Sequence, residues 1–192
     1  MSTADELLVS RAARGDGEAF DQLVRRHTPR MYRVALRITG GPAEAEDVVQ
    51  DAWISAWRGL GTFRAESRVS TWLYRVVTNA ALAQVRRRRP TVSLDAALDS
   101  AGEGGYGLAD TGLLADTRAD PAERAVRAEE VNAVHRAIAK LDVAQRLPLV
   151  LRELEGLSYE EVAEVLQVSV PALRSRLHRA RVALLARLEE VR

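Results

Sequence analysis

The chain has 192 residues, 47% of them hydrophobic, which is enough for one large domain or two small domains with buried cores. It contains no cysteine, which excludes disulfide bonds and thiolate metal sites, and we expect a reducing, cytoplasmic location. The 28 basic and 27 acidic residues nearly cancel, no apolar run has the length of a membrane span, and no secretion-signal pattern is seen.

A first block of helices is predicted from about Asp5 to Arg89. Its apolar residues recur with a period near 3.6, and no stretch alternates as a strand does. Asp16-Gly17 and Gly40-Gly41-Pro42 predict turns, with Pro42 placed to begin a helix, and Pro90 ends the block. The pattern predicts an all-helical N-terminal domain.

The segment from Ala43 to Trp57 carries four carboxylates and two tryptophans. At helical spacing Asp47, Gln50 and Asp51 share one face beside Trp53 and Trp57. A protein-docking surface is the favoured interpretation, because interfaces combine aromatic anchors with a polar rim. The alternatives are a solvated helix face and a metal-dependent nuclease site built on Glu44, Glu46, Asp47 and Asp51.

The next predicted helix, Thr71–Arg89, has Ser70 or Thr71 as its N-cap and ends in four consecutive arginines, Arg86, Arg87, Arg88 and Arg89. Arginines at a helix C-terminus complement the dipole, but four in a row favour phosphate contact. Trp72, Tyr74 and Asn79 precede them, and aromatic rings and amides beside positive charge can hold unpaired bases. It is equally open that Trp72 belongs to the core and that Asn79 is an ordinary polar residue.

Residues 91–120 differ from both flanks in composition. They contain five glycines between Gly102 and Gly112, six acidic residues and one base, Arg118. Low hydrophobicity and like charge predict a flexible linker. Thirty residues can extend to ~100 Å.

Pro121 opens the second block, in which Asp142 is a predicted cap and Pro148 predicts a kink or an early helix end. Ser158 to Leu166 then reads as a short amphipathic helix, with Ser158 and Glu161 forming a capping box. The tight connection from Gln167 to Ser169 leads into a last helix.

The last helix has Pro171 in its first turn and leucines at helical spacing. Four arginines lie between these leucines, at Arg174, Arg176, Arg179 and Arg181. An arginine-rich helix held by a short turn against a supporting helix fits the major groove of DNA. The alternative is an amphipathic helix with a solvated basic face. The three histidines (His27, His135 and His178) are far apart and have no cysteine partners, so a zinc site is not expected.

Five segments, in this order, resemble the extracytoplasmic-function (ECF) class of bacterial RNA polymerase sigma factors. They are Ala45-Glu-Asp-Val-Val-Gln-Asp-Ala-Trp53, Phe63-Arg-Ala-Glu-Ser67, Ser70-Thr-Trp-Leu-Tyr-Arg75 with Asn79, Leu151 to Glu161, and Arg174 to Arg181. The resemblance implies an all-α fold of two small helical domains. These are a region 2 helical bundle over 1–90 and a region 4 helix-turn-helix over 121–192, joined by the flexible linker 91–120.

The resemblance also implies roles for particular residues. Core polymerase would dock on Asp47, Gln50, Asp51, Trp53 and Trp57. The promoter −10 element would be held by Ser70, Thr71, Trp72, Arg75, Asn79, Arg86, Arg87, Arg88 and Arg89. The −35 element would be read by Ser158, Tyr159, Arg174, Ser175, Arg176, His178, Arg179 and Arg181. No catalytic residue, metal or cofactor is expected.

The expected partners are promoter DNA, core RNA polymerase (the coiled coil of its largest subunit and its flap) and an anti-sigma protein. The latter can hold the chain at the membrane, without membrane insertion. The acidic linker suggests a segment that occupies a positively charged channel later filled by RNA. Two rival functions remain, a stand-alone transcriptional regulator and the metal-dependent nuclease.

Overall fold

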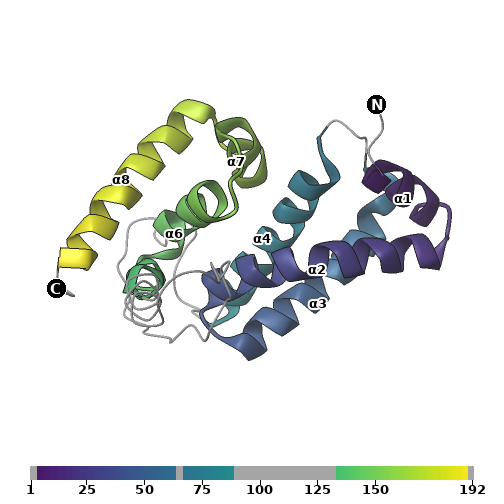
Figure 1. Ribbon diagram of the computed structural model, residues 1–192, viewed down its shortest axis with the longest axis horizontal. Helices are drawn as coiled ribbons and strands as arrows, with labels where there is room; N and C mark the ends of the chain where they lie inside the picture. Colours follow the sequence, from purple (N-terminus) through teal and green to yellow (C-terminus); the bar gives the residue numbers. More distant parts are fainter. Residues whose placement is uncertain (1–3, 64–66, 89–132, 190–192) are drawn as a thin grey trace, which may run out of the picture.

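The computed structural model describes residues 4–63, 67–88 and 133–189. Within these ranges the secondary structure is helical and no strand occurs, which confirms the all-α prediction. The helices form two units that lie side by side in Figure 1. We call them the N-terminal bundle (residues 4–88) and the C-terminal unit (residues 133–189). The predicted linker, Pro121 and Arg89 lie outside the described residues.

The N-terminal bundle is built from four α-helices and one short 3₁₀ turn. Its elements are α1 (Ala4–Ala12), α2 (Gly17–Thr39), α3 (Pro42–Gly59), η1 (Leu60–Thr62) and α4 (Val69–Arg88). Asp16 caps α2 by accepting a hydrogen bond from the Ala19 N–H at 3.1 Å. Gly40 ends α2 with a φ of 84°, a left-handed conformation that glycine adopts without strain. Both predicted breaks are therefore confirmed.

The predicted N-cap of α4 is wrong. The helix begins at Val69, and the Trp72 N–H donates to the Arg68 carbonyl at 3.0 Å, so Ser70 and Thr71 already lie inside the first turn. The Thr71 hydroxyl does not cap its own helix but donates to the Glu161 carboxylate of α7 at 3.4 Å. A contact with the other unit, 90 residues away in sequence, has replaced the local role.

The C-terminal unit contains a helical stretch at residues 133–139 and four further elements. These are α6 (Val143–Leu149), the π-helical turn η2 (Val150–Leu154), α7 (Tyr159–Leu166) and α8 (Val170–Glu189). Asp142 caps α6, as predicted, by accepting from the N–H groups of Ala144 and Gln145. The α-helical hydrogen bonding ends at Leu149, one residue after Pro148, and continues as the π turn, which confirms an early end.

The helix-turn-helix prediction is confirmed in its local details. The Ser158 hydroxyl accepts from the Glu161 N–H at 3.1 Å, and the Glu161 carboxylate accepts from the Ser158 N–H at 2.8 Å. Gln167 then reverses the chain with a φ of 53°. Pro171 lies in the first turn of α8, where a missing N–H leaves no hydrogen bond unmade.

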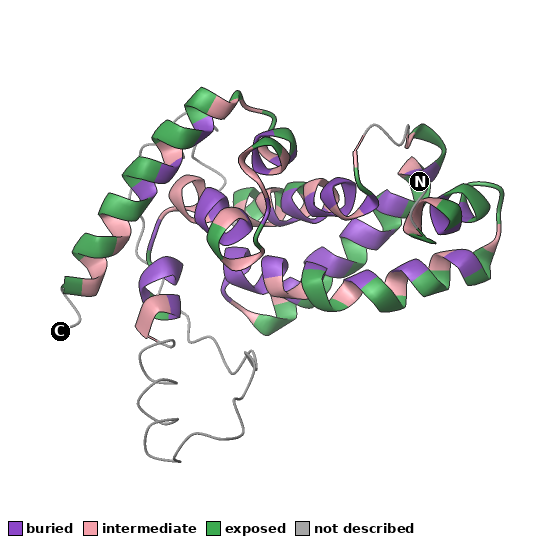
Figure 2. Ribbon diagram, turned by 45° about the horizontal axis from the view of Figure 1, so that its top comes forward, coloured by how far each residue is buried: buried purple, intermediate pink, exposed green. Residues whose placement is uncertain are grey.

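Apolar side chains line the faces along which the helices meet, and Figure 2 shows this as buried surfaces turned inward in both units. In the N-terminal bundle α2, α3 and α4 pack on one another and α1 lies on α2, whereas in the C-terminal unit α6 and α7 pack on α8. The two units also touch directly. Helix α4 packs against α7, and α2 packs against α6 and η2.

Candidate functional site

One side of α3 carries an exposed mixed face, which we call the α3 face (Asp47, Gln50, Asp51, Ile54 and Trp57). Its members recur at intervals of three or four residues, so they share one side of the helix. Ile54 and Trp57 are 43% and 46% exposed, which is unusual for large apolar side chains. Aromatic and aliphatic groups surrounded by carboxylates and an amide make a surface suited to another protein.

Trp53, predicted with this surface, lies inside the bundle instead. Its indole N–H donates to the Thr28 hydroxyl at 2.9 Å, and its ring packs edge-on against Phe20 at a centroid distance of 5.5 Å. Phe20 also packs against Trp57 at 4.8 Å. The two tryptophans thus differ in role, since Trp53 anchors α3 on α2 whereas Trp57 is fixed by Phe20 and remains half exposed.

A second surface runs along α4, where Arg75, Asn79 and Arg86 fall on one side of the helix by their spacing. Asn79 and Arg86 are exposed and Arg75 is partly buried. Arg87 is exposed too and reaches the edge of the α3 face, donating to Asp51 at 3.2 Å. The side chains of Arg88 and Arg89 lie outside the described residues.

The residues at the start of α4 are less accessible than the DNA-binding interpretation of the sequence implies. Trp72 is 7% exposed and packs against Phe63 at a centroid distance of 5.4 Å, and Thr71 is 2% exposed. Ser70 is partly buried. In this conformation Trp72 belongs to the core, whereas Asn79 lies on the surface.

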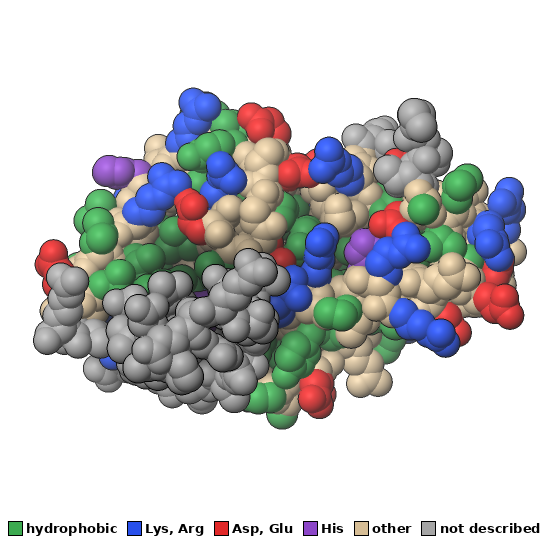
Figure 3. Space-filling model, in the orientation of Figure 1, with side chains coloured by type: hydrophobic (Ala, Val, Ile, Leu, Met, Phe, Trp, Pro, Cys, Tyr) green, Lys and Arg blue, Asp and Glu red, His purple; other side chains and the backbone are tan. Residues whose placement is uncertain are grey.

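The third surface is the outer side of α8. Leu173, Leu177 and Ala180 are buried against the rest of the unit, which turns the polar side chains outward. Those between Arg174 and Arg181 are exposed or partly exposed and comprise Arg174, Ser175, Arg176, His178, Arg179 and Arg181. Basic side chains gather over the part of the surface formed by α7 and α8 in Figure 3.

Tyr159 joins this basic surface to α7. The guanidinium groups of Arg152 and Arg174 lie 4.9 Å and 5.6 Å from the centre of its ring, within the range of cation–π attraction. Hydrogen bonding to Arg181, and secondarily to Arg152, lowers the pKa of the Tyr159 hydroxyl. Arg181 also forms an exposed ion pair with Glu153 at 2.6 Å, which fixes its side chain across the unit.

The junction between the two units is built around one carboxylate. Glu155 follows η2, and its side chain is 3% exposed. Its Oε1 accepts from Arg37 of α2 at 2.6 Å, and its Oε2 accepts from the Tyr74 hydroxyl of α4 at 3.0 Å, with Arg33 at 3.7 Å. We call these four residues the Glu155 cluster. The Arg37 side chain is 4% exposed, so the central ion pair is almost completely buried.

The protonation of the cluster follows from its burial. Burial raises the pKa of the Tyr74 hydroxyl, and the Glu155 charge adds to the effect, so the hydroxyl stays protonated and donates. Burial lowers the pKa of Arg37, whereas the Glu155 carboxylate acts in the opposite direction. Sequence reasoning missed this cluster, and its only local signal is an arginine within the apolar run Val34-Ala-Leu-Arg-Ile38.

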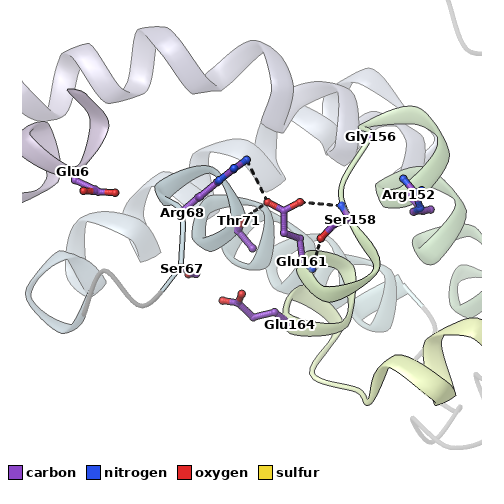
Figure 4. A pocket seen from close by; sticks show the side chains of 9 residues that line it. All are labelled: Glu6, Ser67, Arg68, Thr71, Arg152, Gly156, Ser158, Glu161 and Glu164. Carbon is purple, nitrogen blue, oxygen red and sulfur yellow. Dashed lines mark hydrogen bonds and ion pairs between the residues drawn. The ribbon is translucent and has the colours of Figure 1, made fainter. Parts of the chain in front are cut away.

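Two further contacts join the units. Arg146 of α6 donates to the Ile38 carbonyl at 2.8 Å, one of the last carbonyls of α2, which have no partner within their own helix. On the other side of the junction the Glu161 carboxylate receives Thr71 and lies 3.8 Å from Arg68 (Figure 4). The surface here is hollowed into a cleft of about 770 Å³, lined by Glu6, Ser67, Arg68, Thr71, Arg152, Gly156, Ser158, Glu161 and Glu164.

The histidines are separated in space as well as in sequence. His27 lies 3.0 Å from Asp5 and His135 is buried, whereas His178 is exposed on α8. Among the described residues, no group of three or more His, Asp or Glu side chains is arranged to hold a metal ion. None of the described helices is long and apolar enough to cross a membrane.

Comparison with known protein families assigns both units. Residues 23–91 match the model of sigma-70 region 2, and residues 132–184 match that of sigma-70 region 4. The chain is 41% identical to the RNA polymerase sigma-H factor of Pseudomonas aeruginosa, over 94% of this chain and 91% of that protein. It is 39% identical to the ECF RNA polymerase sigma factor SigM of Mycobacterium tuberculosis, over 95% and 83% of the two chains.

Solved structures agree with the sequence relatives. The structure of CnrH in complex with the cytosolic domain of CnrY is 30% identical and has a TM-score of 0.68, covering 98% of this chain and 99% of that one. RpoE of Bartonella quintana, solved with the anti-sigma factor NepR, shares the fold with a TM-score of 0.62 at 24% identity, over 90% and 98% of the chains. The chain therefore belongs to the ECF class of RNA polymerase sigma factors.

Proposed function

We propose that this sigma factor divides its work among three surfaces of its own chain. The α3 face docks on core RNA polymerase, the exposed side of α4 around Asn79 holds the −10 element, and the outer side of α8 between Arg174 and Arg181 reads the −35 element. In this proposal residues 1–90 form the domain for polymerase and the −10 element, and residues 121–192 form the −35 domain. Residues 91–120 link them.

The observation that carries the proposal is the accessibility of the α3 face. Within that face Asp47 and Gln50 are exposed, and the described packing gives them no structural role. Trp57 packs against Phe20 on one side but remains half exposed. Trp53 contributes indirectly, because it fixes α3 on α2 through Thr28. Polar groups around a half-exposed tryptophan are the composition expected of a protein-docking surface.

The DNA surfaces follow from charge and groove geometry. The exposed arginines of α8 extend from a helix that a short turn holds against α7, which is the arrangement that places side chains in the major groove. Arg75, Asn79 and Arg86 combine an amide that can pair with a base edge and cations that can contact phosphates.

We also propose that the chain acts as a specificity subunit without an active site of its own, in the cytoplasm with the polymerase. Sigma-factor relatives solved with the cytosolic domain of CnrY and with the anti-sigma factor NepR support an anti-sigma protein as a further partner.

The direct experiment is a titration of fluorescently labelled protein against purified core polymerase. The double variant Asp47→Ala with Gln50→Ala is expected to bind core more weakly and to keep the helical content of the wild type. Glu18→Ala with Gln22→Ala is the matched control, because these are also exposed residues one helical turn apart, on α2. Equal affinity of both double variants contradicts the docking assignment.

The same preparation tests the two rival functions. A stand-alone regulator binds specific DNA without binding core polymerase, and a nuclease cleaves DNA when Mg²⁺ is added. Specific initiation that requires both core and this chain, without cleavage by the chain alone, supports the specificity-subunit proposal.

A further inference from the structure

The two DNA-reading units are in direct contact, although the promoter elements that they serve are far apart on DNA. Helix α4 packs on α7, and residues of α2 contact α6 and η2. Elements about two helical turns apart on DNA require the two units to span roughly 70 Å. A chain folded as in Figure 1 therefore cannot engage both elements at once. The units must separate before the promoter is bound.

We propose that the Glu155 cluster is a latch that holds the free sigma factor in this closed conformation. It crosses the junction where the charged side chains are almost completely buried, and there the Glu155 carboxylate receives Arg37 from α2 and Tyr74 from α4. One side chain of the C-terminal unit thus ties two helices of the N-terminal bundle. An ion pair buried to this degree is not screened by salt as surface pairs are.

The closed conformation depends on Glu155 because both arginines of the cluster need its carboxylate. Removing the Glu155 charge leaves Arg37 and Arg33 as buried or half-buried cations without a carboxylate, and burying an uncompensated charge is costly. Separation of the units, in contrast, lets water solvate the same arginines. Loss of Glu155 therefore drives the equilibrium toward the open conformation rather than toward a rearranged closed one.

The closed conformation also covers a part of the proposed −10 surface. Thr71 is buried against α7, where its hydroxyl donates to the Glu161 carboxylate. Glu161 caps α7 at the same time through the Ser158 N–H. The first turn of α4 is thus joined to the first turn of α7, and opening releases both. The exposed side of α8 stays accessible in either conformation, so the latch controls simultaneous binding of two elements and not binding of the −35 element alone.

The latch rests on the proposed assignment of the two units to two promoter elements, but its conformational test does not. Because the chain contains no cysteine, two dyes can be placed by the single substitutions Ser10→Cys in α1 and Ala172→Cys in α8. Both positions are exposed, one in each unit. Energy transfer between the dyes in the free, full-length protein reports whether the units are together.

The expected result is high transfer for the wild type and lower transfer for Glu155→Gln and for Glu155→Lys, with a tenfold or larger shift toward the open form for the lysine variant. Glu160→Gln is the matched control, since it removes an exposed carboxylate five residues away and should not change transfer. The charge exchange Arg37→Glu with Glu155→Arg should restore part of the closed population. Tyr74→Phe removes a single hydrogen bond and should give a smaller shift toward the open form. It provides the test if the charge variants fold poorly.

A second readout uses binding. A chain that must first open engages a DNA fragment carrying both promoter elements with an apparent affinity that is proportional to its open fraction. In the presence of core polymerase, Glu155→Gln should therefore bind such a fragment more tightly than the wild type. A DNA duplex with the −35 element alone should bind both proteins equally. Low transfer in the wild type, or equal transfer in the wild type and both Glu155 variants, overturns the latch, whereas failure of core binding in all variants overturns the proposed function instead.

Discussion

Replacement of Trp57 by alanine is the sharpest test of the α3 face. The side chain is 46% exposed, and a tryptophan side chain has roughly 150–250 Å² to bury, so about 100 Å² remains available to a partner. At about 25 cal/mol per Å² this area corresponds to ~2.5 kcal/mol of binding free energy. We therefore expect Trp57→Ala to weaken core-polymerase binding by about 60-fold, at about 1.4 kcal/mol for each factor of ten.

The assay is an equilibrium titration of labelled sigma factor against core polymerase, with the thermal unfolding of each variant recorded in parallel. Trp57→Ala also removes the edge-on contact with Phe20, which contributes ~0.5–1.5 kcal/mol to the stability of the fold, so the titration belongs well below the unfolding midpoint. Leu7→Ala is the control, because Leu7 is 59% exposed but lies on α1, and it should change core affinity less than twofold. Wild-type affinity of a folded Trp57→Ala protein would refute the reasoning.

Three further predictions concern DNA recognition and pH. Asn79→Ala should reduce open-complex formation on a matched promoter by ~1–3 kcal/mol and weaken discrimination between bases at one −10 position. Transcription from templates with each of the four bases at every −10 position measures this, and unchanged discrimination contradicts the prediction. Arg86→Ala should weaken binding to all promoters alike and reduce the salt slope by about one unit, whereas Arg174→Ala should change which −35 sequences are selected from a randomised library; the reverse pattern contradicts this division. Burial lowers the pKa of His27 below 6.5, although Asp5 opposes the shift, so the unfolded chain takes up the proton first on acidification. The contribution of His27 to the free energy of unfolding is thus complete above about pH 6.5, and the free energy of unfolding should decrease as the pH falls below this value. Urea unfolding at several pH values checks this, and a His27→Asn variant that keeps the whole pH dependence shows that other groups cause it.

Features governed by neighbouring residues were predictable from the sequence. The capping box of Ser158 and Glu161 and the break at Gly40 depend on side chains and backbone within four residues of each other, and the structure has both. The period of the apolar residues likewise predicted the helices whose buried faces form the core.

Features governed by distant residues were not predictable. The cap expected at Ser70 or Thr71 fails because Thr71 bonds Glu161 across the junction, a contact that the local pattern cannot reveal. The Glu155–Arg37 pair joins positions 118 residues apart, and glutamate and arginine have no sequence pattern that fixes such a partner. Trp53 and Trp57 are four residues apart on one helix, and only the position of Phe20 and Thr28 separates the buried ring from the half-exposed one.

The central claim is that two separate surfaces of one sigma factor read two promoter elements while the polymerase holds its α3 face. It is tested most directly by mapping photo-crosslinks from the assembled promoter complex, with a reactive group on a cysteine introduced at the exposed Ala83 beside Asn79 or at Ala172 in the first turn of α8. The account predicts that the α4 probe reacts with the −10 element and the α8 probe with the −35 element of the same promoter, and only when core polymerase is present for the −10 contact. Crosslinking of both probes to one element, or of the α4 probe to polymerase alone, would contradict it.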